Sequence, residues 1–528
     1  MTARDCSKAY IVGGGLASIS TAAYLIKNGK IPGGSITIFE ELDFFGGSLD
    51  AEKNQSDRAY FMRGFRMMEE KVYSALFDLM SFIPMTDDPE KSIYEDYFDF
   101  NEEVKTYSLS RLVENGKAIN AKPFKMPFKE RVKLLKLLTF KEENIENVKI
   151  EDYFGPAFFE SNFWYLFSTT FSFQSWHSLE EFKRYILRFI HVSSTVHTQQ
   201  CIKSTRYNQF ESIMLPIKTW LRRNGVNFLR GCAVTDVEFE NTDEGKSIKK
   251  LTYTQNGTVN EIDTGLNDLT FLSIGSMTAD STTGTMEKAP ETFRSLRNSS
   301  WKLWEKISET DNNFGKPEVF KGDLDKSKWV SFTATFNDPL FFDLMEKITM
   351  KKAGTEGPVT IKDSKWLISF GLPNQPHFKD QPEDLFVFWG YGLHPDKVGN
   401  FVKKKMSECT GREILTELIY HLKMEEHLEL IMKSAKCLPC MMPYITSQFM
   451  PRIKGDRPEV VPKNSDNFAF IGQFCNIPDD IVFTLEYSVR SAQIAVNTLL
   501  NLDKSVTPIY KGQKDVAVIL KTIMTALR

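Results

Sequence analysis

Glycines and small residues near the N-terminus have the spacing of a loop that holds phosphate groups. The segment Gly13-Gly-Gly15-Leu-Ala-Ser18 matches the pattern G-x-G-x-x-G, with serine in the third place. The first glycine permits a tight turn, the second lets a pyrophosphate approach the backbone, and the third place needs only a small side chain. Phosphates then sit at the N-terminus of the following helix, where free N–H groups favour negative charge. By itself the loop predicts a dinucleotide site of any kind, or an ordinary glycine turn before a helix.

An acidic residue follows at the distance expected of a ribose ligand. Glu40 ends the second predicted strand, about 20 residues beyond the glycine loop, where a carboxylate accepts hydrogen bonds from ribose hydroxyls. Glu41 is an adjacent competitor for this role. The pair strengthens the prediction of a dinucleotide site over that of a simple turn.

Later glycine turns favour FAD among the dinucleotides. Gly46-Gly47-Ser48 follows the second predicted strand, and two further apolar strands end at Gly275 and Gly472. Four such turns in this order are typical of flavoproteins. The predicted cofactor-binding residues are Gly13, Gly15, Ser18, Glu40, Glu41, Gly46, Gly47, Ser48, Arg63, Gly64, Val234, Ser273, Gly275, Ser276, Gly472, Phe483 and Thr484.

Hydrophobic periodicity predicts the elements that position these residues. Strand 9–12, amphipathic helix 16–28 and strand 35–39 form a β-α-β unit. Residues 56–82 carry Met and Phe at helical spacing and are predicted as a helix. Strands are predicted from residue 225 onward, and a strand, a turn and a helix over 468–500, so both ends of the chain should build one domain.

The predicted fold class is α/β: a Rossmann-like FAD-binding domain with an inserted α+β substrate domain and a helical cap. The predicted parts are an FAD-binding β-α-β unit with its motif helix (1–120), a largely helical substrate and cap region (121–224), strands returning to the FAD-binding domain (225–290), a substrate-binding α+β region (291–460) and a final FAD-binding segment with C-terminal helices (461–528).

Composition limits the class of protein. The 66 basic and 69 acidic residues among 528 give no support for nucleic-acid binding. The 42 phenylalanines could line a long apolar cavity or build a bulky core. Seven scattered cysteines and an N-terminus without a long apolar run favour a cytoplasmic protein. Cys437 and Cys440 have no partner pair at zinc spacing, so no metal site is predicted.

Long strings between Ile11 and about Val496 resemble the oleate hydratase family, formerly called myosin-cross-reactive antigens. They are Arg63-Gly-Phe-Arg-Met-Met68, Thr169-Thr-Phe-Ser-Phe-Gln-Ser-Trp-His-Ser178, Glu181-Phe-Lys-Arg-Tyr185, Arg206-Tyr-Asn-Gln209, Gln375-Pro-His-Phe-Lys-Asp-Gln-Pro-Glu-Asp384, Met442-Pro-Tyr-Ile-Thr-Ser-Gln-Phe-Met-Pro-Arg452 and Gly472-Gln-Phe-Cys-Asn-Ile-Pro-Asp-Asp480.

The resemblance implies a hydro-lyase that adds water to a cis double bond of an unsaturated fatty acid, as from oleate to 10-hydroxystearate. It also implies that FAD is required without net redox change, and that the reduced form supports the working site. Tyr185 aligns with the family tyrosine that delivers the proton, although its position on helix 179–190 also suits a core tyrosine. Gln209 matches a residue near the substrate, or it caps the start of a helix.

Two departures from the family pattern affect the chemistry. Where well-known members have a glutamate that orients water or contacts the flavin, this chain has Met67, as a subgroup of the family does. A thioether is only a weak acceptor. The water would then be held by a backbone carbonyl, by Glu69 or Glu70, or by the flavin edge.

The second departure concerns the fatty acid carboxylate. Gly371 and Pro373 stand where the family supplies Thr and Asn, which leaves Asn374 and His377 as candidate substrate ligands. We therefore expect an altered preference for chain length or head group.

Other functions and partners stay open at this point. The alternatives are a flavin oxidoreductase that acts on a lipid or an amine, and a non-catalytic protein that binds FAD and lipid. Helices over 125–141 and 516–528 either pack on the core or touch a membrane surface peripherally. The chain is short at both ends beside longer members, so both a monomer and a homodimer are considered.

Overall fold

The computed structural model describes residues 6–54, 58–242, 245–265, 267–293 and 296–527. Five short parallel strands bring distant parts of the chain into one sheet. Their order is β20 (Phe468–Ile471), β13 (Leu269–Ser273), β1 (Ala9–Val12), β2 (Ile36–Phe39) and β9 (Asn227–Leu229). Most are apolar runs, as expected of parallel strands that are buried on both faces. The predicted β-α-β unit is confirmed.

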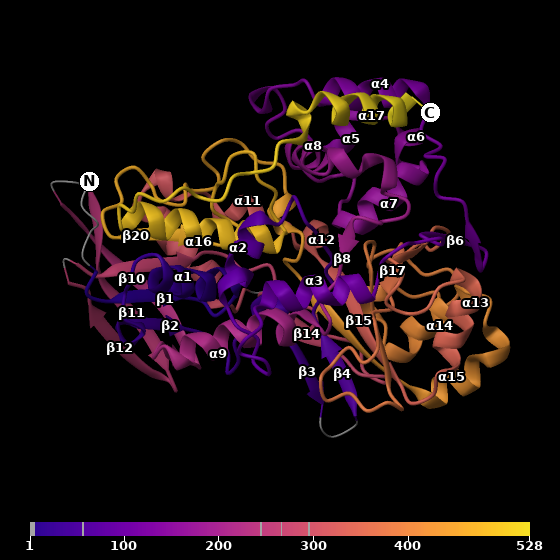
Figure 1. Cartoon of the computed structure of the whole chain (residues 1–528), viewed down its shortest axis with the longest axis horizontal. Coiled ribbons are helices and arrows are strands. Elements are labelled where there is room, and N and C mark those ends of the chain that lie inside the picture. The colour runs from indigo at the N-terminus through magenta and orange to yellow at the C-terminus, as the bar shows by residue number, and fades with distance from the viewer. Residues whose placement is uncertain (1–5, 55–57, 243–244, 266, 294–295, 528) are drawn as a thin grey trace.

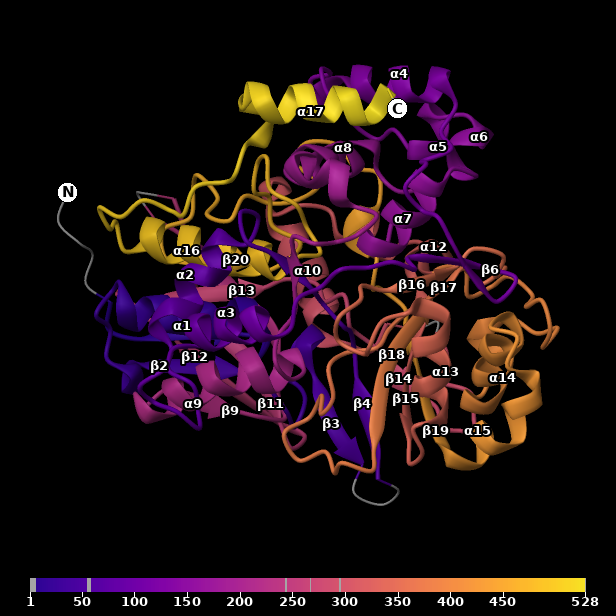
Figure 2. The same ribbon diagram turned by 45° about the vertical axis from the view of Figure 1, so that its right-hand side comes forward.

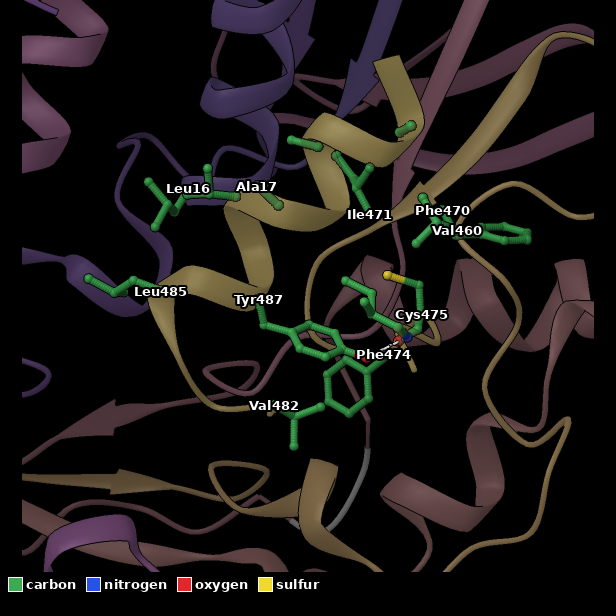
Figure 3. Close-up of a cluster of buried hydrophobic side chains, with 14 of the residues drawn as sticks. Leu16, Ala17, Val460, Phe470, Ile471, Phe474, Cys475, Val482, Leu485 and Tyr487 are labelled. Carbon is green, nitrogen blue, oxygen red and sulfur yellow. Dashed lines mark hydrogen bonds between the residues drawn. The ribbon is translucent and has the colours of Figure 1, made fainter. Parts of the chain in front are cut away.

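Two helices from opposite ends of the sequence pack together on this sheet. They are α1 (Leu16–Lys27) and α16 (Leu485–Leu499) (Figure 1). Figure 3 shows Leu16 and Ala17 of α1 in one buried cluster with Ile471 of β20 and Leu485 of α16. The Tyr487 hydroxyl donates a hydrogen bond of 2.8 Å to the Cys475 carbonyl in the same region. The two ends of the sequence therefore meet in one domain, with β9 and β13 contributed by the middle of the chain.

The predicted helix over 56–82 is wrong. The structure instead has a hairpin of β3 (Ala51–Asn54) and β4 (Ala59–Met62), and helix α2 begins only at Ser74 and ends at Phe82. All four residues of β4 are buried, which a helix with one buried face could not achieve. The backbone of β4 is hydrogen-bonded to side chains that lie far away in the sequence. The Tyr60 N–H donates to Thr335 Oγ1 and the Met62 N–H to Thr333 Oγ1. Predicted residues 55–57 lie outside the described part.

The larger sheet is mostly antiparallel. Its strand order is β14 (Thr282–Thr283), β19 (Ala435–Met442), β15 (Trp329–Phe336), β18 (Phe386–Gly392), β17 (Ile368–Gly371), β16 (Val359–Ile361), β6 (Leu112–Glu114) and β7 (Lys117–Ile119). Helices α13 (Leu340–Thr349), α14 (Gly411–His421) and α15 (Leu428–Ser434) share a core with it. The aromatic residues Trp329, Trp389 and Tyr391 belong to a separate core with β4. Cys437 and Cys440 are both buried in β19.

Helices from residues 128–188 form a cap that the C-terminus joins. The cap contains α4 (Phe128–Leu137), α5 (Ile150–Tyr153), α6 (Pro156–Phe159), α7 (Asn162–Phe171) and α8 (Leu179–Arg188). The last helix, α17 (Val516–Leu527), lies beside α4 at the top of both views (Figures 1 and 2). No helix in the described ranges is long and apolar enough to cross a membrane.

The remaining elements connect these parts. They are the antiparallel sheet β10 (Cys232–Asn241), β11 (Lys246–Gln255) and β12 (Thr258–Asp263), the pair β5 (Met68–Glu69) and β8 (Ile202–Lys203), and helices α3 (Ile93–Glu103), α9 (Leu215–Arg223), α10 (Ser299–Thr310), α11 (Pro317–Lys321) and α12 (Leu324–Ser327).

Candidate functional site

A cleft of about 510 Å³ lies at the carboxyl ends of the parallel strands. The turns after β1, β2, β13 and β20 all contribute to its wall, which is where open parallel sheets bind ligands. Every predicted cofactor-binding residue lines it except Ser18, Gly46 and Gly64. Ser18 is buried below the loop, Gly46 precedes a turn of 3₁₀ helix, and Gly64 lines a neighbouring cavity.

The glycine loop leaves space where a ligand would approach. Gly13 has a φ of 98°, in the left-handed region that favours glycine. A Cβ on Gly14 would lie 2.5 Å from Glu40 Oε2, so no side chain fits there. A Cβ on Gly15 would meet nothing within 4 Å. Gly15 also begins α1 without any side-chain cap, so the positive end of the helix faces the cleft.

The two acidic candidates have different neighbours. Glu40 accepts hydrogen bonds from the Gly14 N–H at 2.6 Å and the Leu42 N–H at 2.8 Å. Burial raises the pKa of Glu40 to about 7. Glu41 instead accepts hydrogen bonds from Asn298 Nδ2 and from the N–H and hydroxyl of Ser299, which begins α10. Glu41 therefore stabilises a helix start, while Glu40 is the carboxylate beside the glycine loop.

Arg66 lines both the cleft and the neighbouring cavity, a role that the sequence prediction missed. Its Nη1 atom is buried without a hydrogen-bond partner among the described residues. Burial lowers the pKa of Arg66 to about 10, which still leaves the guanidinium charged at neutral pH. By contrast, Arg63 pairs with Asp50 at 3.3 Å. The only sequence feature that could have indicated this role is the motif Arg63-Gly-Phe-Arg66, in which Arg66 is the second arginine.

The neighbouring cavity, here called the inner cavity, shares five residues with the cleft: Arg63, Arg66, Phe483, Thr484 and Leu485. It also contains Met67 and Tyr185. A third cavity, here called the apolar pocket, lies under the helical cap and is lined by residues of α4, α7, α8 and α17, including Leu134, Phe167, Ile186 and Thr522. The inner cavity and the apolar pocket share the residues Thr170, Phe171, Tyr185, Phe189, Gln199 and Ile202.

Tyr185 stands where these two cavities meet. Its side chain is 2% exposed and its hydroxyl donates a hydrogen bond of 2.6 Å to the Val482 carbonyl. The rings of Phe171, Phe173 and Phe449 surround it. Burial raises the pKa of Tyr185 well above its ordinary value, so the phenol keeps its proton at neutral pH. The geometry offers a neutral O–H group among aromatic rings, in a wall that the two cavities share.

The acids proposed as substitutes for the missing glutamate do not face a cavity. Residues 66–70 are not helical, contrary to the prediction. Glu69 Oε2 accepts hydrogen bonds from the Lys71 and Val72 N–H groups, and Glu69 Oε1 lies 3.0 Å from His191 Nε2. Glu70 is exposed. Neither lines the inner cavity, the cleft or the apolar pocket, whereas Met67 does line the inner cavity.

Gln209 supports the loop that carries Arg66 and Met67. Its Nε2 donates hydrogen bonds of 3.1 Å to the Arg66 carbonyl and 3.2 Å to Thr205 Oγ1. Its side chain makes no cap to the helix that follows. Gln209 is buried and lines none of the three cavities.

Neither candidate carboxylate ligand lines the inner cavity. His377 is buried, and neither ring nitrogen has a hydrogen-bond partner among the described residues. Burial lowers its pKa to about 3, so the ring is neutral. It packs edge-on against Phe65, with ring centroids 5.9 Å apart, and Phe65 itself lines the inner cavity. Asn374 packs against Gly354. The structure does not bring Asn374 or His377 into the wall of the three cavities.

Solved structures share the fold. Cyclohexylamine oxidase from Brevibacterium oxydans IH-35A matches with a TM-score of 0.53 and 11% identity, over 94% of this chain and 99% of that one. An oxidoreductase from Methanosarcina mazei matches with a TM-score of 0.51 and 12% identity, over 92% and 100% of the two chains. At this identity the likeness concerns the fold alone, and it confirms the predicted Rossmann-like α/β class.

Sequence relatives are much more similar. The chain is 37% identical to an oleate hydratase of Streptococcus pyogenes serotype M49 (strain NZ131), over 98% of this chain and 89% of the relative. It is 34% identical to a linoleate hydratase of Lactiplantibacillus plantarum, over 93% of both chains. The model of the MCRA family matches residues 6–497. The chain therefore belongs to the MCRA family.

Proposed function

We propose that this protein is a hydro-lyase that adds water to a cis double bond of an unsaturated fatty acid, with FAD bound in the cleft and no net redox change. The observation that carries the proposal is the position of Tyr185, a neutral phenol that lines both the apolar pocket and a cavity that adjoins the cleft. The names of the two relatives agree with this reaction.

The residues of the cleft fit FAD. The uncapped start of α1 and the open space at Gly15 suit a pyrophosphate. Arg66 lines the cleft and pairs with no carboxylate among the described residues, so its guanidinium could bind a phosphate or the flavin. Glu40 is placed to accept hydrogen bonds from ribose hydroxyls. FAD held by these residues would supply polar atoms beside the inner cavity, and we propose that its reduced form supports the more active state.

The apolar pocket fits an acyl chain. Phenylalanine, leucine and isoleucine side chains form most of its wall, so a hydrocarbon would gain by leaving water. A chain that extends from this pocket toward the inner cavity passes the Tyr185 hydroxyl. His377 remains our candidate for the carboxylate, with Asn374 as a helper, because its neutral ring lies behind Phe65 and neither nitrogen has a hydrogen-bond partner in the described part of the chain.

The reaction requires a proton at one alkene carbon and water at the other. Tyr185 would donate its proton, and the dry surroundings keep competing water away from the developing positive charge. Gln209 would act indirectly, by holding the backbone of Arg66 in place.

A test of the activity is direct. The protein is incubated anaerobically with FAD, dithionite and oleate, and the lipid is analysed by mass spectrometry. A product heavier by one water supports the proposal. Double-bond loss without added water, or peroxide formed under air, would indicate an oxidoreductase, and bound but unchanged oleate would indicate a binding protein.

FAD binding should strengthen as pH rises from 6 to 8. Ribose hydroxyls donate to the ionised carboxylate of Glu40, whose pKa is raised to about 7 by burial. Between pH 6 and 8 the ionised fraction rises about tenfold, so the affinity should rise by up to about tenfold. Titration of the apoprotein with FAD, followed by flavin fluorescence, measures this. Glu40→Gln should remove the dependence. Glu41→Gln should keep it, and a flat profile in the unaltered protein would contradict the assignment.

We further propose that the α4 and α17 surface binds anionic membranes peripherally and takes up substrate there. Phe128 and Val516 are each 69% exposed, and Leu520 and Met524 are exposed beside them. Lys129 and other exposed lysines border this surface. Both helices line the apolar pocket, so a fatty acid could pass from a bilayer into it.

Leu520→Ser combined with Met524→Ser should weaken binding to phosphatidylglycerol vesicles by about tenfold or more, because two apolar side chains no longer enter the bilayer. Vesicle sedimentation measures the bound fraction. Val259→Ser is a matched control, since Val259 is 65% exposed on β12, far from the cap. Equal binding by both variants and the unaltered protein would rule out this surface.

A further inference from the structure

The helix that carries Tyr185 buries many charged side chains, which are rarely buried unless they are paired. The buried charged residues of α8 are Glu180, Glu181, Lys183, Arg184 and Arg188. Removing charges from water is costly, and a buried ion pair recovers this cost only where its geometry is well defined. Such a pair adds little to stability, so we read the pairs of α8 as contacts that fix where this helix lies.

Two contacts one turn of helix apart hold α8 against the turn 480–484. The Tyr185 hydroxyl donates to the Val482 carbonyl at 2.6 Å, and Arg188 Nη2 lies 3.3 Å from Asp480 Oδ1. Both charged side chains are completely buried. Residues 185 and 188 are three apart, so their side chains leave the same face of the helix. The partners are only two residues apart, so one short turn receives both contacts.

This turn is itself fixed by side chains on both sides of Val482. Before it, Asp480 Oδ1 accepts a hydrogen bond of 2.9 Å from the Ile481 N–H. After it, the Phe483 N–H donates to Gln473 Oε1 at 2.6 Å. The direction of the Val482 carbonyl therefore depends on Asp480, which also receives the guanidinium of α8.

Arg188 also contacts the chain on another side of the inner cavity. Its Nη2 donates a hydrogen bond of 3.0 Å to the Val72 carbonyl, and the next residue, Tyr73, lines the inner cavity. One guanidinium thus contacts two segments that contribute to the wall of this cavity. Neither Arg188 nor Asp480 lines the cleft, the inner cavity or the apolar pocket.

We propose that Arg188 and Asp480 are positioning residues, which place the Tyr185 hydroxyl at the junction of the two cavities by holding α8 against the turn 480–484. The inference rests on the proposed hydratase function, in which Tyr185 donates the proton, and adds two residues that contact neither substrate nor cofactor. Proton transfer depends steeply on where the donor lies, so a small displacement of α8 would slow the reaction. Without the pair, α8 would stay helical and buried, but its distance from the turn would be less well defined.

Other ion pairs of α8 serve this task less directly. Arg457 Nη1 lies 2.9 Å from Glu181 Oε1, and both side chains are completely buried. Glu181 lies one turn of helix before Tyr185, and Arg457 is far from Val482 in the chain. That pair holds the start of α8, whereas the pair of Arg188 holds the part of the helix that faces the Tyr185 partner.

The test replaces the pair by apolar side chains, in the double variant Arg188→Met with Asp480→Leu. One charge of each sign is lost and Arg490 keeps its partner Glu486, so the melting temperature should change little. At saturating FAD and oleate, kcat should fall at least about tenfold while KM and FAD affinity change less than about twofold. Unchanged kcat in a protein of unchanged melting temperature would show that the pair is merely structural.

The same double change in the Tyr185→Phe background shows whether the pair acts through the phenol. There it should lower the remaining kcat by less than about twofold, because the group that it positions is already absent. Equal fold-losses in both backgrounds would overturn the proposal.

A second measurement does not depend on activity. With fluorotyrosine at position 185 alone, fluorine NMR should show one sharp resonance in the unaltered protein and a broadened or split one in the double variant. Identical spectra would overturn the positioning role. If the unaltered holoenzyme adds no water, the proposed hydratase function fails, but this measurement still decides whether the pair positions Tyr185.

Lys246→Met with Asp311→Leu is the control, because this half-buried pair at 2.9 Å lies outside the three cavities. It should leave kcat unchanged, and it should also leave the fluorine spectrum unchanged. If the first double variant does not fold, Asp480→Asn takes its place. The amide keeps the size of the side chain and removes the charge, so the same loss of kcat and the same broadening are expected.

Discussion

Replacing Tyr185 with phenylalanine should lower kcat for oleate hydration by about 10²- to 10⁴-fold, because the change removes the only proton donor that we place at the alkene. The aromatic ring remains, and the rings of Phe171 and Phe449 still pack against it. FAD binding should be unchanged, since Tyr185 does not line the cleft. Activity is measured by mass spectrometry of the hydroxy fatty acid, and FAD content by absorbance.

A stability effect has to be separated from this loss. The substitution leaves the Val482 carbonyl without the hydrogen bond of 2.6 Å from Tyr185, which costs about 1–3 kcal/mol. Tyr97→Phe is the control for losing a buried tyrosine hydroxyl outside the three cavities: Tyr97 is also buried, and its hydroxyl donates a hydrogen bond of 3.5 Å to the Met68 carbonyl. If Tyr185→Phe keeps more than a tenth of the activity at unchanged melting temperature, the acid lies elsewhere.

The sequence predicted best where the determinants are local. The loop around Gly13 and the β-α-β unit around it depend on residues close together in the chain, and the structure confirms that unit. The hairpin of β3 and β4 could not be predicted in this way. Its partners Thr333 and Thr335 lie far along the chain, and the Met and Phe residues before α2 have spacing that also suits a helix.

The candidate site also combines features that the sequence predicts with features that depend on tertiary packing. Tyr185 was named from a family string, but its position between two cavities required the packing of α7 and α8. Glu69 was a reasonable water ligand in sequence, yet its carboxylate is used by two backbone N–H groups and by His191.

Gly15→Val should abolish tight FAD binding, by at least about 100-fold, and leave the protein folded. A Cβ at Gly15 would meet no protein atom within 4 Å, and the backbone there is extended, with φ −85° and ψ −176°. Valine therefore fits the protein itself, and its methyl groups would occupy the space in front of the uncapped start of α1. A pyrophosphate could then no longer approach those N–H groups, and a loss of about 2.7 kcal/mol corresponds to 100-fold in affinity.

Gly34→Val is the matched control, because a Cβ at Gly34 also meets nothing within 4 Å but lies outside the cleft. Both variants should melt at nearly the same temperature without FAD, and only the Gly34 variant should be stabilised when FAD is added. The comparison of these two variants shows whether flavin is lost because the cleft is blocked or because the protein is destabilised. A substitution at Gly14 could not show this, because its side chain would clash with Glu40. Retention of FAD by Gly15→Val would place the pyrophosphate away from the start of α1 and remove the basis for assigning Glu40 to the ribose.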